Sequence, residues 1–548
     1  MLAVTRLYLC AAVLFSTNLQ AQQQKAEGPY RISGTVVNAV TGEPLSRAGV
    51  SIALSSDFSP VQSTQTSPDG RFMFDHLPAA KYALTGSRRG FITAAYDEHE
   101  QFSTAIATGE GLVSENLVLR LVPDAVISGT VAEDSGDPIE NARVSLYRQT
   151  HNSGVERIQL AGNTNTDDIG AYEFTGLAPG NYFIAASGRP WYADTNAGMI
   201  HVSTQESSKE FPHSPLDLVY ATTFYADVTN PDDATPIPLK GGDRVQINFA
   251  LHPQPALHLL IHTPVPDDPR QMNMMPFPAL DQQVFGMSDN PEANGRLIAP
   301  GLMEMSVAPG QYRLRVNGGP SAQAMRSTTI DVTSDQSVDA GAGQPLADVT
   351  GKVAMASGEA LRSNTTMILT SYDGENRNGS VVDKQGNFEM ANVLPGRYRL
   401  DGWGIGGHLF ISKLAATGAE VDGDRITIGS SPVMIAATVY RDPDLEVTGF
   451  AKRDGKPVPG VMIVLVPRDA ANNRDLFRRD QSDSDGSFSL RDVIPGKYTV
   501  VAIADGWTLN WAEPNVISRY LSSGQSVTVT EQNSKTTVLK DTVEVQPK

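Results

Sequence analysis

Clusters of acidic and histidine side chains are the residues here whose types and spacing could do chemistry. Residues 97–100 read Asp-Glu-His-Glu and form the densest cluster, while Asp483 and Asp485 flank a turn in a similar way. Carboxylate oxygens in such loops can bind Ca²⁺, but we favour a solvated acidic loop for both segments. His258 and His262 are four residues apart, a spacing that holds metal ions on helices, but their apolar surroundings favour a strand.

The motifs of common enzyme classes are missing from the sequence. None of the nine histidines begins the His-x-x-Glu pair that a zinc peptidase needs, and there is no Gly-x-Ser-x-Gly elbow and no Walker loop. The only cysteine, Cys10, lies in an apolar N-terminal run, which excludes thiol chemistry from a processed chain. We therefore expect no catalytic residue, no metal site, no cofactor and no enzymatic activity.

Aromatic side chains that follow predicted strands are the candidates for ligand contact. Flat rings beside polar groups can stack on sugars, but rings in these positions can also plug the open end of a sandwich. Of two tryptophans four residues apart, we expect Trp507 to be the buried cap and Trp511 to be the more exposed ring. The candidate ligand contacts are Trp191, Tyr192, Trp403 and Trp511.

A repeated strand and turn pattern must position these side chains. In four copies a turn glycine stands twelve residues before a tyrosine, and an aromatic residue follows the glycine by two. Glycine accepts the positive φ of a tight turn, so we expect a hairpin there, and residues two apart on the next strand share one face. The glycine and tyrosine pairs are Gly70 and Tyr82, Gly170 and Tyr182, Gly386 and Tyr398, and Gly486 and Tyr498.

A second element precedes each copy of the first. It reads as a strand with a central glycine, a Gly-x-Pro turn and another strand, and it begins near Ile32, Ile127 and Val447, with a weaker form at Val349. Together the two elements make a module of about 100 residues with roughly seven short strands. Because no useful length shows helical periodicity, the sequence predicts an all-β fold of Greek-key sandwiches.

The order of these motifs resembles the bacterial carboxypeptidase regulatory-like domain. That family is related in fold to transthyretin and to starch-binding, carbohydrate-binding-like sandwiches. The resemblance implies a tandem array of about five Greek-key β-sandwich domains that accompany chemistry rather than perform it. It covers most of residues 30–122, 124–200, 346–402 and 445–510. Residues 254–345 depart from the pattern and keep mainly the Pro-Gly-x-Tyr ending at Tyr312.

Composition and the N-terminus indicate an exported, acidic protein. The 548 residues carry a formal net charge of −18, which repels nucleic acid and anionic lipid. Arg6 is followed by the apolar residues 7–15 and then a polar stretch, as in a secretory signal peptide, and we expect cleavage after Ala21. The apolar run is too short to cross a bilayer, and we expect no transmembrane segment elsewhere.

The repeats divide the chain into a signal peptide and five predicted domains. The predicted boundaries are 1–21 for the signal peptide, then 29–123, 124–253 with a connector, a divergent sandwich at 254–345, then 346–443 and 444–548.

The expected function is binding or spacing outside the cytoplasm. We expect a secreted, non-catalytic, multi-domain protein of the bacterial cell envelope, in the shape of a rod, with a glycan or an envelope protein as its partner. One alternative is a carbohydrate-binding protein, which fold resemblance supports only by analogy. The other is an accessory protein of an exported peptidase.

Overall fold

The computed structural model describes most of the chain. The described residues are 28–151, 154–193, 214–263, 278–289, 294–299, 301–316, 326–340, 344–371, 377–404, 407–422, 425–441, 445–471, 473–530 and 535–548. Their regular secondary structure is almost entirely β-strand, which confirms the all-β prediction. The predicted signal peptide lies outside these residues. No helix in the described part of the chain is long and apolar enough to span a membrane.

Five groups of strands follow one another, here called modules 1 to 5. Module 1 contains β1 (Tyr30–Asn38), β2 (Gly49–Leu54), β3 (Pro60–Gln65), β4 (Arg71–Leu77), β5 (Lys81–Ser87), β6 (Ala94–Ala95), β7 (Ile106–Ala107) and β8 (Leu117–Leu121). Module 2 contains β9 (Ala125–Glu133), β10 (Arg143–Thr150), β11 (Arg157–Asn165), β12 (Ala171–Leu177), β13 (Gly180–Ser187), β14 (Leu218–Tyr220), β15 (Thr223–Phe224), β16 (Ile237–Leu239), β17 (Arg244–Gln246), β18 (Phe249–Leu251) and β19 (Pro253–Pro255).

The remaining modules have the same richness in strands. Module 3 contains β20 (Leu257–His262), β21 (Pro278–Val284), β22 (Met287–Asp289), β23 (Asn294–Ala299), β24 (Leu302–Val307), β25 (Gly310–Val316), β26 (Arg326–Val332), β27 (Gln336–Asp339) and β28 (Gln344–Pro345). Module 4 contains β29 (Ala347–Met355), β30 (Thr366–Ser371), β31 (Arg377–Val381), β32 (Asn387–Val393), β33 (Gly396–Gly404), β34 (Gly407–Thr417), β35 (Ala419–Asp422), β36 (Arg425–Ile428) and β37 (Val433–Arg441). Module 5 contains β38 (Glu446–Arg453), β39 (Lys456–Pro457), β40 (Met462–Pro467), β41 (Arg478–Gln481), β42 (Ser487–Leu490), β43 (Gly496–Ile503), the helix α1 (Pro514–Leu521), β44 (Gln525–Val529), β45 (Thr536–Val538) and β46 (Val543–Gln546).

The first strand organises every module in the same way. In module 1, β1 pairs antiparallel with β4 on one side and parallel with β8 on the other. The same triplet recurs as β12, β9 and β17, as β24, β20 and β27, as β32, β29 and β37, and as β42, β38 and β45. The divergent third module therefore shares the strand plan of the others.

The repeat tyrosine has one role in all five modules. Its ring is buried, and its hydroxyl donates to the backbone carbonyl four residues earlier, at 2.7–3.1 Å. This bond ties the tyrosine's strand to the turn before it, much as the tyrosine corner does in other sandwiches. The tyrosines are Tyr82, Tyr182, Tyr312, Tyr398 and Tyr498.

The turn before each aromatic strand differs from the expected hairpin. Its glycine does have a positive φ, for example 76° at Gly70 and 77° at Gly486. The flanking strands, however, belong to different layers, because β3 pairs with β2 whereas β4 pairs with β1. The hairpin prediction was wrong because a tight turn does not fix which strands pair, and here the chain crosses between the two layers.

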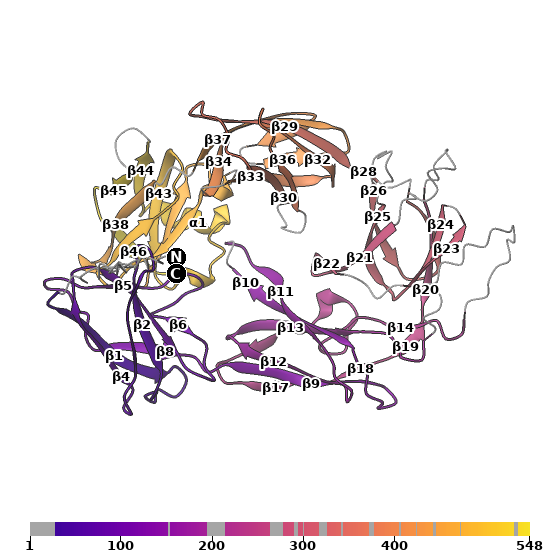
Figure 1. The fold of residues 1–548 in the computed structure, drawn as a ribbon, viewed down its shortest axis with the longest axis horizontal. Helices are drawn as coiled ribbons and strands as arrows, with labels where there is room; N and C mark the ends of the chain where they lie inside the picture. The colour runs from indigo at the N-terminus through magenta and orange to yellow at the C-terminus, as the bar shows by residue number, and fades with distance from the viewer. Residues whose placement is uncertain are drawn as a thin grey trace, which may run out of the picture.

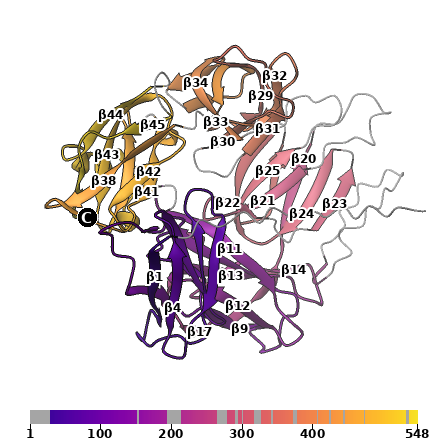
Figure 2. The ribbon, with the colours of Figure 1, turned by 60° about the vertical axis from the view of Figure 1, so that its left-hand side comes forward.

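The modules follow one another around a ring (Figure 1). Module 1, at the indigo end, lies against module 5, at the yellow end, and the second view shows the same neighbours (Figure 2). Hydrogen bonds between residues about 400 positions apart, such as Lys81 and Asp483, join the two modules. The expected extended rod is therefore wrong, because a motif analysis of each module says nothing about contacts between distant ones.

Candidate functional site

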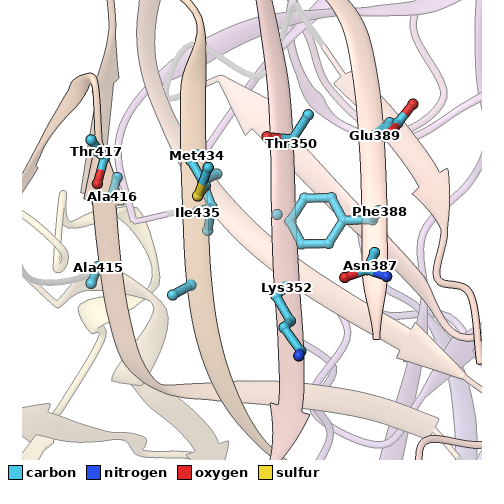
Figure 3. A pocket seen from close by; sticks show the side chains of 12 residues that line it. Thr350, Lys352, Asn387, Phe388, Glu389, Ala415, Ala416, Thr417, Met434 and Ile435 are labelled. Carbon is cyan, nitrogen blue, oxygen red and sulfur yellow. The ribbon is translucent and has the colours of Figure 1, made fainter. Parts of the chain in front are cut away.

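A shallow hollow of about 580 Å³ lies on the outer face of module 4 (Figure 3). The neighbouring strands β32, β29, β37 and β34 form it. Strand register places their outward side chains in two rows across the face. One row is Glu389, Thr350, Met434 and Thr417, and the next is Asn387, Lys352, Ala436 and Ala415.

The hollow exists because its middle is lined by short side chains. Ala415 and Ala436 form the low part, while Met434, which is 64% exposed, stands beside them. Lys352 and Glu389 add one charge of each sign and are exposed. Small-molecule sites usually enclose most of their ligand, so this open face is suited to contact with another surface rather than to a reaction.

Trp191 and Tyr192 lie together in module 2, after β13. Trp191 is 88% exposed, and its ring meets that of Tyr192 edge to face at 5.6 Å. Carboxylates at the end of β9 lie beside Tyr192. They are Glu133, which accepts a hydrogen bond from the Tyr220 hydroxyl, and Asp134, which contacts His252 at 3.3 Å. An exposed indole can stack on a sugar, and carboxylates beside the neighbouring tyrosine can accept hydrogen bonds from its hydroxyls.

Trp403 stands apart from that pair. It lies near the end of β33 in module 4 and is 49% exposed. Since β33 pairs with β30 and β34, Trp403 is opposite Thr366 and His408. The structure therefore does not gather the predicted ligand-contact aromatics into one site.

The expectation that Trp511 is the more exposed tryptophan of its pair is wrong. Trp507 and Trp511 are 8% and 7% exposed, so both rings are buried. Nor does either plug the end of the sandwich. They cover the outer face of the β40 and β43 layer, where they pack with Val464, Val501 and Ile517 of α1. A ring buried in this position does not meet a ligand in this conformation.

The acidic cluster at 97–100 belongs to the contact between modules 1 and 5. Glu100 accepts a hydrogen bond from Arg479 at 2.6 Å, and His99 stacks on Trp507 with ring centroids 4.9 Å apart. The Gln481 amide donates to the carbonyl of Asp97. Glu100, His99 and the Asp97 carbonyl therefore face module 5, whereas the Glu98 side chain is exposed and bonds within module 1.

The second acidic turn completes the same contact from the other side. The Asp483 carboxylate forms an ion pair with Lys81 of β5 at 2.7 Å and accepts a hydrogen bond from the backbone N–H of Ala105 at 3.0 Å. Ser484 exchanges two further bonds with module 1, through its N–H to Ala105 and its hydroxyl from Ala107. Both clusters singled out by their sequence thus meet across one interface.

Arg479 is the central side chain of this interface and carries no signal in the sequence. It is 4% exposed, and its guanidinium lies 4.3 Å above the Trp511 ring and 5.1 Å from that of Phe102. Cation–π contact and the Glu100 ion pair act on the same group. Module 2 also reaches this point, because Ala512 donates to the carbonyl of Gly154 at 3.0 Å.

Two buried carboxyls beside the interface have unusual acidity. Burial raises the pKa of Asp480 to about 7, although the backbone N–H of Ser489 opposes the shift. Burial also raises the pKa of Asp483, while Lys81 pulls it back down. Desolvation penalises the charged form, which explains both directions.

The two spaced histidines are part of a strand, as predicted. His258 and His262 both lie on β20, where His258 contacts Asp217 at 3.1 Å and His262 contacts Ser337 at 2.9 Å. Across the described ranges, no group of three or more histidine, cysteine or acidic side chains could hold a metal ion.

Family models match the chain at both ends of the ring. Residues 31–108 and 126–208 match the model of the carboxypeptidase regulatory-like domain. These two stretches, in modules 1 and 2, are similar to carboxypeptidase regulatory-like domains. This confirms the resemblance drawn from the repeats for modules 1 and 2, and the matched residues cover most of both. Residues 446–543, in module 5, match the model of the second β-sandwich domain of NOMO1-like subunits of the BOS complex.

Solved structures resemble the chain only distantly. A streptococcal ancillary pilin is 10% identical over 53% of this chain and 99% of its own, with a TM-score of 0.20. The TIE protein of Bacillus anthracis is 9% identical over 75% and 73%, with a TM-score of 0.19. The minor pilin GBS52 of Streptococcus agalactiae is 14% identical over 44% and 99%, also at 0.19. No curated protein matches the chain in sequence.

Proposed function

We propose that this protein is a non-catalytic binding scaffold that acts outside the cytoplasm, at the cell envelope. The family that matches modules 1 and 2 is a regulatory, accessory type of domain. The face that module 4 offers is open and shallow, which favours contact with a large partner over enclosure of a substrate. The apolar N-terminal run supports export.

The docking of module 1 on module 5 is the observation that carries this proposal. A spacer needs length, whereas this contact brings the two ends of the repeat array together. Closing the array also holds the surfaces of the modules in a defined arrangement. Such an arrangement serves a protein that presents several contact surfaces to a partner at once.

Localisation and binding can be tested with the purified mature chain. We expect the chain in the exported fraction of the cell, with binding to isolated envelope and no hydrolysis of peptides, esters or glycosides above background. Carboxypeptidase activity that a chelator abolishes would overturn the proposal. Co-purification with an exported hydrolase would instead select the accessory role.

Carbohydrate is the second candidate ligand, and Trp191 favours it. This ring is exposed and lies edge to face against Tyr192, which in turn lies beside Glu133. On a glycan array, Trp191→Ala should lose any binding that the parent chain shows. Phe58→Ala is the matched control, because Phe58 is an exposed aromatic of module 1. Equal loss in both variants would argue against a sugar site at Trp191.

A further inference from the structure

The contact between modules 1 and 5 joins parts of the chain that no linker holds together locally. Its hydrogen-bonded residues are 377 to 435 positions apart. Many hydrogen bonds and ion pairs cross the contact, and polar interfaces between domains permit relative motion. We propose that this contact acts as a latch. When the contact breaks, the ring opens and the aromatic surface of module 5 that contains Trp507 and Trp511 is uncovered.

The closed latch depends on one buried ion pair. Arg479 is almost fully buried between Trp511, Phe102 and Glu100, so its charge has lost most of its water. A buried charge is tolerated while its partner is present and becomes costly when the partner is removed. In an open ring the guanidinium of Arg479 is hydrated again, so removal of its Glu100 partner would cost little free energy in that state.

Polar atoms of module 5 beside the closed contact lack hydrogen-bond partners. Among the described residues, the indole N–H groups of Trp507 and Trp511 and the Oδ1 atom of Asn510 are buried and make no hydrogen bond. Module 1 covers Trp507 through His99, and module 2 covers Trp511 through Gly154. Such groups regain hydrogen bonds in water, so opening offsets part of the lost contact and brings the two states closer in free energy.

The experiment compares two neighbouring charge deletions in the module 1 loop. Glu100→Gln removes the partner of Arg479. Glu98→Gln is the matched control, because Glu98 accepts a bond from Ala95 within its own module. The background carries Trp191→Phe and Trp403→Phe, so that fluorescence reports only the remaining two of the four tryptophans, Trp507 and Trp511.

Acrylamide quenching and the radius of gyration in solution then measure opening. With Glu100→Gln we expect quenching to rise toward that of an exposed indole and the radius of gyration to increase. Glu98→Gln should leave both at the parent values. If Glu100→Gln behaves like Glu98→Gln, or if the parent chain forms a dimer through this contact, the latch is disproved.

A disulfide across the contact separates opening from local unfolding. The Cγ of Asp97 lies 3.4 Å from where a Cβ on Gly460 would stand, which puts Asp97→Cys and Gly460→Cys within reach of a bridge, and the positive φ of 74° at Gly460 makes that substitution strained. In the Glu100→Gln chain, this bridge should restore low quenching and a small radius, and reductant should release both. Quenching that stays high in the bridged chain would mean that module 5 itself had loosened, and the proposal would fail.

Discussion

Modules 4 and 5 have similar inner cores. They differ in the outer face of the layer that contains the tyrosine strand, which is partly exposed in module 4 and covered in module 5. In both, an aromatic ring lies where a Cβ of the first-strand glycine would be, with Phe388 under Gly351 and Phe488 under Gly449. On β30 of module 4, buried and half-buried side chains alternate. On β40 of module 5 every side chain is buried.

The segment after the tyrosine strand causes this difference. After β43 the chain of module 5 continues through Trp507 and Trp511 into α1, which together cover the outer face of β40. After β33, module 4 turns back directly into β34, and Trp403 remains about half exposed. One motif thus fixes the inner core, while the segment after it decides which module can dock on another.

The inner cores should respond alike to truncation. Phe388→Ala and Phe488→Ala should each lower the local free energy of unfolding by about 3–5 kcal/mol, because each ring is buried in its core. Hydrogen exchange of β33 and β43 measures this module by module. A clearly smaller loss in one module would show that the two cores are not equivalent.

The dependence of stability on pH should distinguish module 5 from module 4. The folded-state pKa of Asp480 is about 7, above the ordinary 3.8, so the folded module holds this proton more tightly and loses stability as the pH rises between these values. Asp480→Asn should remove this loss and stabilise the module above neutral pH by at most roughly 4 kcal/mol. Hydrogen exchange of β43 at both ends of the range measures the effect. A variant less stable than the parent at high pH contradicts the assignment.

Truncation of a tryptophan on the outer face should lower the stability of module 5 more than that of module 4. Trp507→Ala should destabilise module 5 by about 2–4 kcal/mol, since it removes a ring buried under module 1. Trp403→Ala should change module 4 by less than about 1 kcal/mol, because that ring is half exposed. Denaturant unfolding monitored by hydrogen exchange compares the losses of stability in the two modules. Similar losses would mean that the exposed ring has an unrecognised structural role.

The open face of module 4 should be the most tolerant surface. Met434→Gln replaces an exposed side chain in the hollow and should shift stability by no more than about 0.5 kcal/mol. The same exchange measurement on β37 tests it. A large loss would indicate that another surface covers this face in solution.

Much of each inner core could be predicted from the sequence. The glycine and the aromatic residue two positions later lie within one turn and strand, and period-two geometry then sets which side chains face inward. Phe488 and Tyr498 are buried as that rule requires. The unbroken apolar run from Val461 to Val466 also carried a signal, since strands buried on both faces lack alternation.

Only the tertiary structure decided how the outer faces and loops are used. Glu100 and Arg479 are 379 positions apart, and no sequence motif around either residue predicts its contact with the other. The same holds for Trp511, whose exposure depends on Arg479 and on Gly154 of module 2. Inner cores follow from local periodicity, whereas contacts between modules depend on the accumulated geometry of every junction around the ring, which no short motif encodes.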